Sequence, residues 1–207
     1  MFITHPPASE DTRRIIEGTA REMGFEMNLT KAWAWRPDIY GDFGALRAKL
    51  TSRSALGTRD QAVAVCATAA ERGDSYCALA WGDKLGKLAG APLAAAVISN
   101  AADGDAPLTP RDEAIAAWAR KVVDDPNGTT ADDVARLRDA GLADKDIFEL
   151  TAFIAFRLAF STINDALGVQ PDWQLEADAD PAIAAAVNFG RRPAARPSDA
   201  SRRTAGR

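Results

Sequence analysis

Apolar residues recur every three or four positions along most of the chain, the spacing that places them on one face of an α-helix. In the front part of the chain this spacing is followed by Ile39, Phe43, Leu46 and Leu50. In the back part we expect the longest helix to bury a face made of Ile147, Leu150, Ile154, Leu158 and Ile163. No strand-like alternation of β-branched and polar residues stands out. The pattern therefore predicts an all-α fold.

Capping residues, glycines and prolines predict where the helices begin and end. A side chain that can cap a helix, followed by an acid or a proline, occurs several times along the chain. These signals predict helices from Ser9 to about Gly24, from Thr30 to before Pro37, from Thr58 to about Arg72, from the break at Gly73-Asp74-Ser75 to about Gly90, from Thr109 onward, from Thr130 to Gly141, from Asp144 to about Gly168, and from Asp180 onward.

The domain organisation follows from composition. Alanine, the best helix former, accounts for 44 of the 207 residues. We expect one helical domain over residues 1–190, with a front half at 1–99 and a back half at 109–190 joined by the linker NAADGDAPL. Residues 191–207 contain six Arg, one Asp and no large apolar residue, so we expect a disordered basic tail.

Charge and chemistry exclude several classes of function. The net charge is −4, and without the +5 of residues 191–207 it is −9, which argues against nucleic acid as a partner. No apolar run reaches the roughly 18 residues of a membrane span, and the N-terminus shows no secretory signal. Two cysteines make no disulfide framework, so we expect a cytoplasmic protein. His5 is the only histidine, so we expect no metal site, no cofactor and no Ser-His-Asp triad.

Cys77 is the candidate catalytic residue. If Asp74 or Ser75 caps the helix that follows, Cys77 lies in its first turn, where the helix dipole favours a thiolate. A thiolate attacks peroxides and disulfides. The alternative is that Cys77 is a small core residue.

Several neighbours in sequence could assist this cysteine. We expect Trp81 to pack over the thiol one turn on, and Arg59 to help keep it ionised. Cys66 is expected in the core. On one continuous helix it would lie about 16 Å from Cys77, so a disulfide requires the chain to fold back at Gly73.

Three segments of the chain are familiar as a set: AWAWRPDI from Ala32, RDQAVAVCATAAERGDSYCALAWGDKLGKLAG from Arg59, and VARLRDAGLADKDIFELTAFIAFRLAFSTINDALGV from Val134. Together they resemble the carboxymuconolactone decarboxylase and alkylhydroperoxidase D superfamily. The resemblance covers about residues 28–172. It implies an AhpD-like helical bundle that assembles as a homo-oligomer.

The superfamily's peroxidase branch carries Cys-x-x-Cys-x-x-x-His, with a glutamate one helix earlier. Aligned on this sequence, the second cysteine falls on Cys77 and the first on Asp74. Trp81 occupies the histidine position, and the glutamate position falls near Ala62. The catalytic motif is therefore degenerate, and proton delivery would fall to water, Asp74, Tyr76 or another chain.

The resemblance implies a thiol-dependent peroxidase that uses Cys77, Asp74 and Tyr76, with Trp81 and Arg59 lining the substrate pocket. Its partners would be a hydroperoxide and an external thiol, which resolves a sulfenic acid on a single cysteine. Two alternatives stay open. One is a lyase or isomerase acting on a lactone or carboxylic acid, and the other is a catalytically degenerate, oligomeric binding protein.

Overall fold

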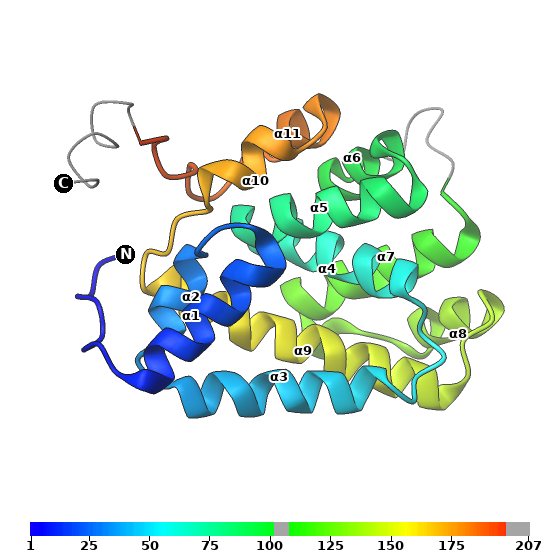
Figure 1. The fold of residues 1–207 in the computed structure, drawn as a ribbon. Coiled ribbons are helices and arrows are strands. Elements are labelled where there is room, and N and C mark those ends of the chain that lie inside the picture. Colours follow the sequence, from blue (N-terminus) through cyan, green and yellow to red (C-terminus); the bar gives the residue numbers. More distant parts are fainter. Residues whose placement is uncertain (102–107, 198–207) are drawn as a thin grey trace.

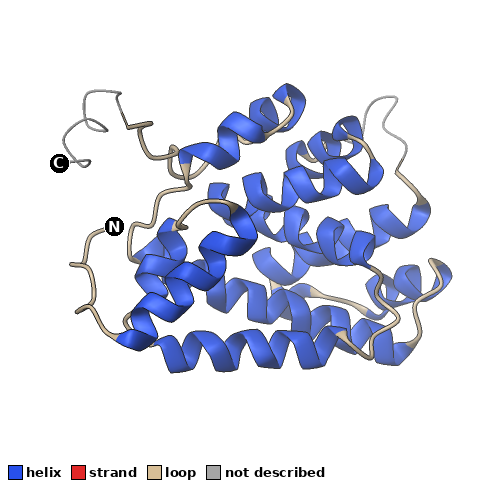
Figure 2. Ribbon diagram, viewed as in Figure 1, coloured by secondary structure: helices blue, strands red, loops and turns tan. Residues whose placement is uncertain are grey.

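The structure is a computed structural model that describes residues 1–101 and 108–197. Within those ranges the regular structure is entirely helical, which confirms the predicted fold class (Figure 2). The helices are α1 (Glu10–Met23), α2 (Asn28–Trp33), α3 (Pro37–Thr51), α4 (Thr58–Arg72), α5 (Ser75–Ala89), α6 (Ala91–Ser99), α7 (Pro110–Asp124), α8 (Ala131–Asp139), α9 (Asp144–Ala166), α10 (Trp173–Asp178) and α11 (Pro181–Ala186), with a 3₁₀ turn at Pro126–Gly128.

Helix α4 forms the centre of the bundle. Its residues from Ala62 to Ala69 are all buried, because α5, α6, α7 and α9 pack around it (Figure 1). A helix that is small and apolar on every side suits this position. A second, smaller cluster joins α2, α5 and α9, where the rings of Trp33 and Phe160 stack with their centroids 4.9 Å apart.

The predicted helix boundaries hold where a capping side chain marks them. Ser9, Thr109, Thr130 and Asp180 each accept a backbone N–H in the first turn of the helix that follows. Other boundaries differ by a few residues: α2 begins at Asn28, and Thr30 lies inside it, fully buried. Helices α6 and α10 were not predicted, since neither has a capping side chain that bonds its first turn.

The predicted buried face of α9 needs correction, and the apolar spacing along α3 does not mark a buried face. Helix α3 has no buried residue, and Ile39 and Leu46 are exposed, because α3 lies along the outside of α9 (Figure 1). On α9, Ile163 is exposed although it follows the spacing of Ile147, Leu150 and Ile154, which are buried.

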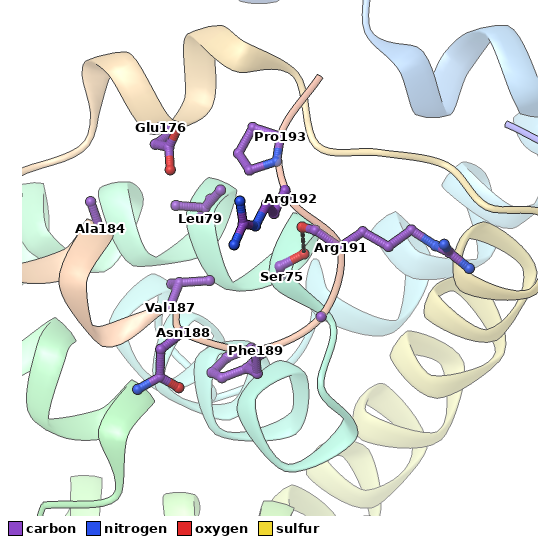
Figure 3. A pocket seen from close by; sticks show the side chains of 11 residues that line it. Ser75, Leu79, Glu176, Ala184, Val187, Asn188, Phe189, Arg191, Arg192 and Pro193 are labelled. Carbon is purple, nitrogen blue, oxygen red and sulfur yellow. Dashed lines mark hydrogen bonds between the residues drawn. The ribbon is translucent and has the colours of Figure 1, made fainter. Parts of the chain in front are cut away.

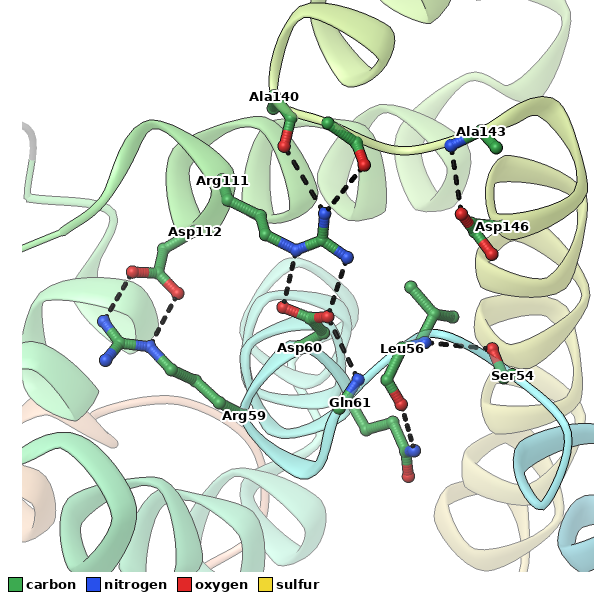
Figure 4. Close-up of polar contacts among 12 residues, drawn as sticks. Ser54, Leu56, Arg59, Asp60, Gln61, Arg111, Asp112, Ala140, Ala143 and Asp146 are labelled. Carbon is green, nitrogen blue, oxygen red and sulfur yellow. Dashed lines mark hydrogen bonds and ion pairs between the residues drawn. The ribbon is translucent and has the colours of Figure 1, made fainter.

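Helices α4 and α7 each carry an Arg-Asp dipeptide in their first turn and bind each other through it (Figure 4). Arg59 of α4 donates from Nε and Nη2 to Asp112 of α7, at 3.0 and 2.6 Å. In return Arg111 of α7 donates to Asp60 of α4, at 3.1 and 3.0 Å. Asp60 and Asp112 also bond the backbone N–H of the residue before their own helix. These crossed ion pairs fix the two helix ends against each other.

Two glycines let α11 dock on α5. A Cβ at Gly82 or Gly86 would lie 2.8 Å from the side chain of Ile183. Only glycine permits so close an approach, and Ile183 is 1 % exposed as a result.

The chain beyond α11 crosses the first turn of α5. Ser75 Oγ donates to the carbonyl of Arg191 at 2.6 Å, and the amide of Ala194 donates to the carbonyl of Pro171 at 2.8 Å. The predicted basic tail thus begins with residues that bond to the domain, and its residues 198–207 lie outside the described part of the chain. Most of the predicted linker, 102–107, also lies outside it.

Candidate functional site

Cys77 lies in the first turn of α5, as predicted. Gly73, with φ of 75°, ends α4 in the left-handed conformation and turns the chain back on itself. Asp74 then caps α5, and its Oδ1 accepts the N–H of Cys77 at 2.9 Å. The fold-back that a Cys66–Cys77 contact requires is therefore present, although both thiols are free.

The sulfur of Cys77 faces polar groups of α9. Nη2 of Arg157 donates to Sγ at 3.0 Å, and Oγ of Ser161 lies 3.8 Å from it. Arg157 and Ser161 are themselves buried, at 4 % and 2 % exposed. The surroundings of the thiol are thus a guanidinium and a hydroxyl, brought from a helix eighty residues further along the chain.

The expectation of a resting thiolate is wrong. Cys77 is only 4 % exposed, and burial raises the pKa of its thiol to about 12. The charge of Arg157 works in the opposite direction, and Asp74 raises the pKa further by its charge and as a hydrogen-bond partner. At neutral pH the closed structure therefore holds a thiol, because desolvation of the anion outweighs the guanidinium and the helix dipole.

Trp81 lies beside this centre, one turn after Cys77. The guanidinium of Arg157 stands over its ring at 5.5 Å from the centroid, and Nζ of Lys84 stands over it at 4.4 Å. Arg157 also covers the ring of Phe160, at 5.2 Å. The aromatic rings hold the guanidinium in place through cation–π contacts.

Tyr76 and Arg59 are placed elsewhere by the structure. The hydroxyl of Tyr76 bonds to Asp172, which also accepts the N–H of Asn28, so Tyr76 ties α5 to the start of α2. Burial raises the pKa of Tyr76, and the charge of Asp172 adds to this effect. Arg59 is the second residue of α4, at the end remote from Cys77, and it binds Asp112. Neither residue meets the thiol through a bond in the described structure.

Sequence reasoning missed Arg157 and Ser161. Both lie on the helix with the clearest apolar periodicity, where an arginine reads as a solvated residue. No local signal marks them, since only the packing of α9 against α5 brings them to Cys77. One sequence feature could have indicated that Arg157 is buried: it is the only charged residue in the apolar stretch FIAFRLAF.

A hollow of about 550 Å³ lies on another side of α5 (Figure 3). Its walls include Ser75, Leu79 and Glu176, together with residues 187–193 of the C-terminal segment. Ser75 and Leu79 are each two residues from Cys77, roughly half a turn around the helix. This hollow is therefore separate from the thiol.

The described residues contain no group of three or more His, Cys, Asp or Glu arranged to hold a metal ion. Among the helices that the structure describes, none is long and apolar enough to cross a membrane.

The arrangement is that of an all-helical protein with a single cysteine at a helix start. No family model matches the sequence, and no curated protein matches it. Solved structures do. The AhpD core of an uncharacterized peroxidase-related protein from Ralstonia eutropha JMP134 has 26 % identity and a TM-score of 0.74, over 84 % of this chain and 93 % of that chain.

Two further structures show the same architecture. A peroxidase-related protein from Silicibacter sp. TM1040 has 20 % identity and a TM-score of 0.73, over 84 % of this chain and 91 % of that one. The debrominase Bmp8, in a cysteine-to-alanine variant bound to 2,3,4-tribromopyrrole, has 16 % identity and a TM-score of 0.69, over 84 % and 94 %. The chain belongs to the AhpD-like fold superfamily, as its sequence predicted.

Proposed function

We propose that the chain is a one-cysteine peroxidase that reduces organic hydroperoxides through Cys77. The contact between Arg157 and the sulfur carries this proposal. A buried guanidinium that donates to Sγ stabilises the thiolate form, which is the reactive one. The likeness to two peroxidase-related structures supports the same reaction class.

The first step makes a sulfenic acid. The thiol proton passes to Asp74, whose buried Oδ2 has no hydrogen-bond partner in the described structure. The thiolate then attacks the terminal oxygen of the hydroperoxide, the O–O bond breaks, and the departing alkoxide takes the proton from Asp74 to leave as an alcohol. The sulfur is oxidised, and the peroxide is reduced.

The second step regenerates the thiol. Because the first position of the family's cysteine pair is Asp74, resolution requires an external thiol. One such thiol condenses with the sulfenic acid to form a mixed disulfide and water, and a second releases Cys77 and leaves as a disulfide. The reductant is oxidised by two electrons for each peroxide consumed.

Reaction with a substrate requires Cys77 to become accessible. Helix α3 has no buried residue of its own, and it packs on α9 next to Arg157, because Phe43 of α3 lies 5.7 Å from the ring of Phe160 that Arg157 covers. We infer that the site opens at α3. Opening also hydrates the sulfur, which lowers its pKa from the raised value of the closed form.

The test is peroxide consumption by the reduced protein with excess thiol, compared across Cys77→Ser, Cys66→Ser and the parent chain. We expect Cys66→Ser to match the parent and Cys77→Ser to abolish turnover. Brief exposure to peroxide should add roughly 16 Da, trapped by dimedone at Cys77. A Cys77→Ser variant as active as the parent would overturn the proposal.

Reductive debromination is a second candidate, favoured by the likeness to Bmp8. In that reaction an aryl bromide and two thiols give the arene, hydrogen bromide and a disulfide. Incubation of the same variants with 2,3,4-tribromopyrrole and excess thiol separates the two, since bromide release by the parent without peroxide consumption would favour this reaction. Inactivity on both substrates would favour the lyase or the binding protein.

A further inference from the structure

Arg157 is a buried cation without a carboxylate partner. Its side chain is buried, Nη2 bonds to the neutral thiol of Cys77, and Nε has no hydrogen-bond partner in the described structure. A guanidinium has five N–H donors and cannot be deprotonated in a protein. A charge buried in this way is costly unless an anion completes it.

A second cation shares an aromatic ring with Arg157. Nζ of Lys84 lies 4.4 Å from the centroid of the Trp81 ring, and the guanidinium of Arg157 lies 5.5 Å from the same centroid. Across the described residues neither cation forms an ion pair within 4.0 Å. By contrast, Lys87, Arg120 and Lys145 on the same or adjacent helices are paired.

The carboxylate of Asp74 forms no ion pair with Arg157 within 4.0 Å. Its Oδ1 accepts the N–H of Cys77 at 2.9 Å, and its Oδ2 is buried with no hydrogen-bond partner. Asp74 bonds the backbone of Cys77 and Arg157 bonds its sulfur, and because the two do not bond to each other, Nε of Arg157 stays available to a ligand.

We propose that Arg157 anchors a carboxylate on the substrate, with Lys84 at the rim, so that Cys77 acts on a small organic acid rather than on a neutral molecule. The inference rests on the proposed function for its reaction and on Arg157 for its charge. Trp81 offers an aromatic surface to the substrate's apolar body. The favoured class is a carboxylate-bearing organic hydroperoxide.

The test uses a probe that cannot react. Binding of 4-isopropylbenzoate and of 4-isopropylbenzamide to the reduced parent protein is measured by calorimetry. We expect the acid to bind at least about tenfold more tightly than the amide, as one charge-assisted hydrogen bond predicts. Added salt should weaken the acid alone.

Variants locate the preference. Arg157→Met should abolish it, Arg157→Lys should keep part of it, and Lys84→Met should reduce it. Lys87→Met is the matched control, since Lys87 lies on the same helix but is already paired with Asp83 at 2.7 Å. If Arg157→Met does not fold, the exposed Lys84 still decides: a full preference in Lys84→Met overturns the proposal.

Other results also overturn it. They are equal binding of acid and amide, no saturable binding of the acid at millimolar concentration, and a preference that persists in a folded Arg157→Met. The binding assay needs no turnover, so the two proposals fail separately. Preference for the acid without peroxide consumption would leave the anion site and overturn the peroxidase.

Discussion

The guanidinium of Arg157 lies 3.0 Å from the sulfur of Cys77, although the two residues come from different helices, eighty positions apart. The contact joins α9 to the first turn of α5. It opposes the burial that raises the pKa of the thiol, so the reactivity of Cys77 depends on a residue that its own sequence motif does not contain.

Replacing Arg157 by Met should raise the pKa of Cys77 further, because a charge that favours the thiolate is lost. At pH values below the pKa of the thiol, the rate of alkylation of Cys77 by iodoacetamide in the parent should rise about tenfold for each unit by which the pH is increased. In Arg157→Met the profile should move to higher pH, and in Arg157→Lys it should move less. Mass spectrometry separates Cys77 from Cys66, and an unchanged profile would contradict the prediction.

Asp165 should make the protein more stable in mild acid than at neutral pH. Burial raises the pKa of Asp165 to about 6, and the charge of Asp74 adds to this, while Arg72 and Arg191 oppose it. A raised pKa in the folded state contributes stability below the unfolded value of 3.8, and this contribution is lost as the pH rises through 6.

Asp165→Asn should therefore raise the free energy of unfolding at pH 7 by about 1–2 kcal/mol, after allowance for screening by solvent. Urea unfolding at pH 4 and pH 7 measures it. Asp144→Asn, on the same helix, is the control with the opposite sign, since Arg138 lowers the pKa of Asp144. A gain in both variants would show that the effect is not specific to Asp165.

The crossed ion pairs should contribute more than surface pairs. Arg59→Met leaves the carboxylate of Asp112, which is 1 % exposed, without its guanidinium, and should cost about 2 kcal/mol of unfolding free energy. Arg14→Met removes an exposed pair with Glu10 and should produce no resolvable change. Thermal unfolding of the two variants decides, and equal melting temperatures would contradict the prediction.

Gly190→Ala should loosen the C-terminal segment. Gly190 has φ of 70°, and a Cβ there would lie 2.9 Å from the amide nitrogen of Ser75 and close to the carbonyl of Gly73. Gly24→Ala is the matched control, because its φ is 81° but its Cβ would meet nothing within 4 Å.

Both variants incur the left-handed strain of roughly 1 kcal/mol, and only Gly190→Ala adds the clash. Limited proteolysis should then release the C-terminal segment faster from Gly190→Ala than from Gly24→Ala. Equal rates would show that the segment does not depend on this close approach.

The sequence predicted the fold well because most helix boundaries are encoded locally. Thr109 and Thr130 bond their own first turns, so their helices are visible without tertiary structure. Apolar spacing was less reliable: it cannot tell a face that meets the core, such as Leu150, from one that lies on an outer helix, such as Leu46.

Only the part of the site that lies on a single helix could be predicted from the sequence. Asp74 and Cys77 are neighbours on α5, and their bond follows from helix geometry. Arg157 reaches the thiol through the packing of α9, which no short pattern encodes. The pKa of Cys77 could not be predicted for the same reason, since burial is a property of the assembled bundle.

The glycine contact between α5 and α11 packs one face of α5 tightly, whereas α3 lies on the outside of the bundle. On the face of α5 that carries Gly82, even an added Cβ would lie 2.8 Å from the side chain of Ile183, so α11 leaves no space against the backbone of α5 there. Helix α3 has no buried residue whereas much of α5 is buried, so amide hydrogens of α3 should exchange with deuterium well before those of α5.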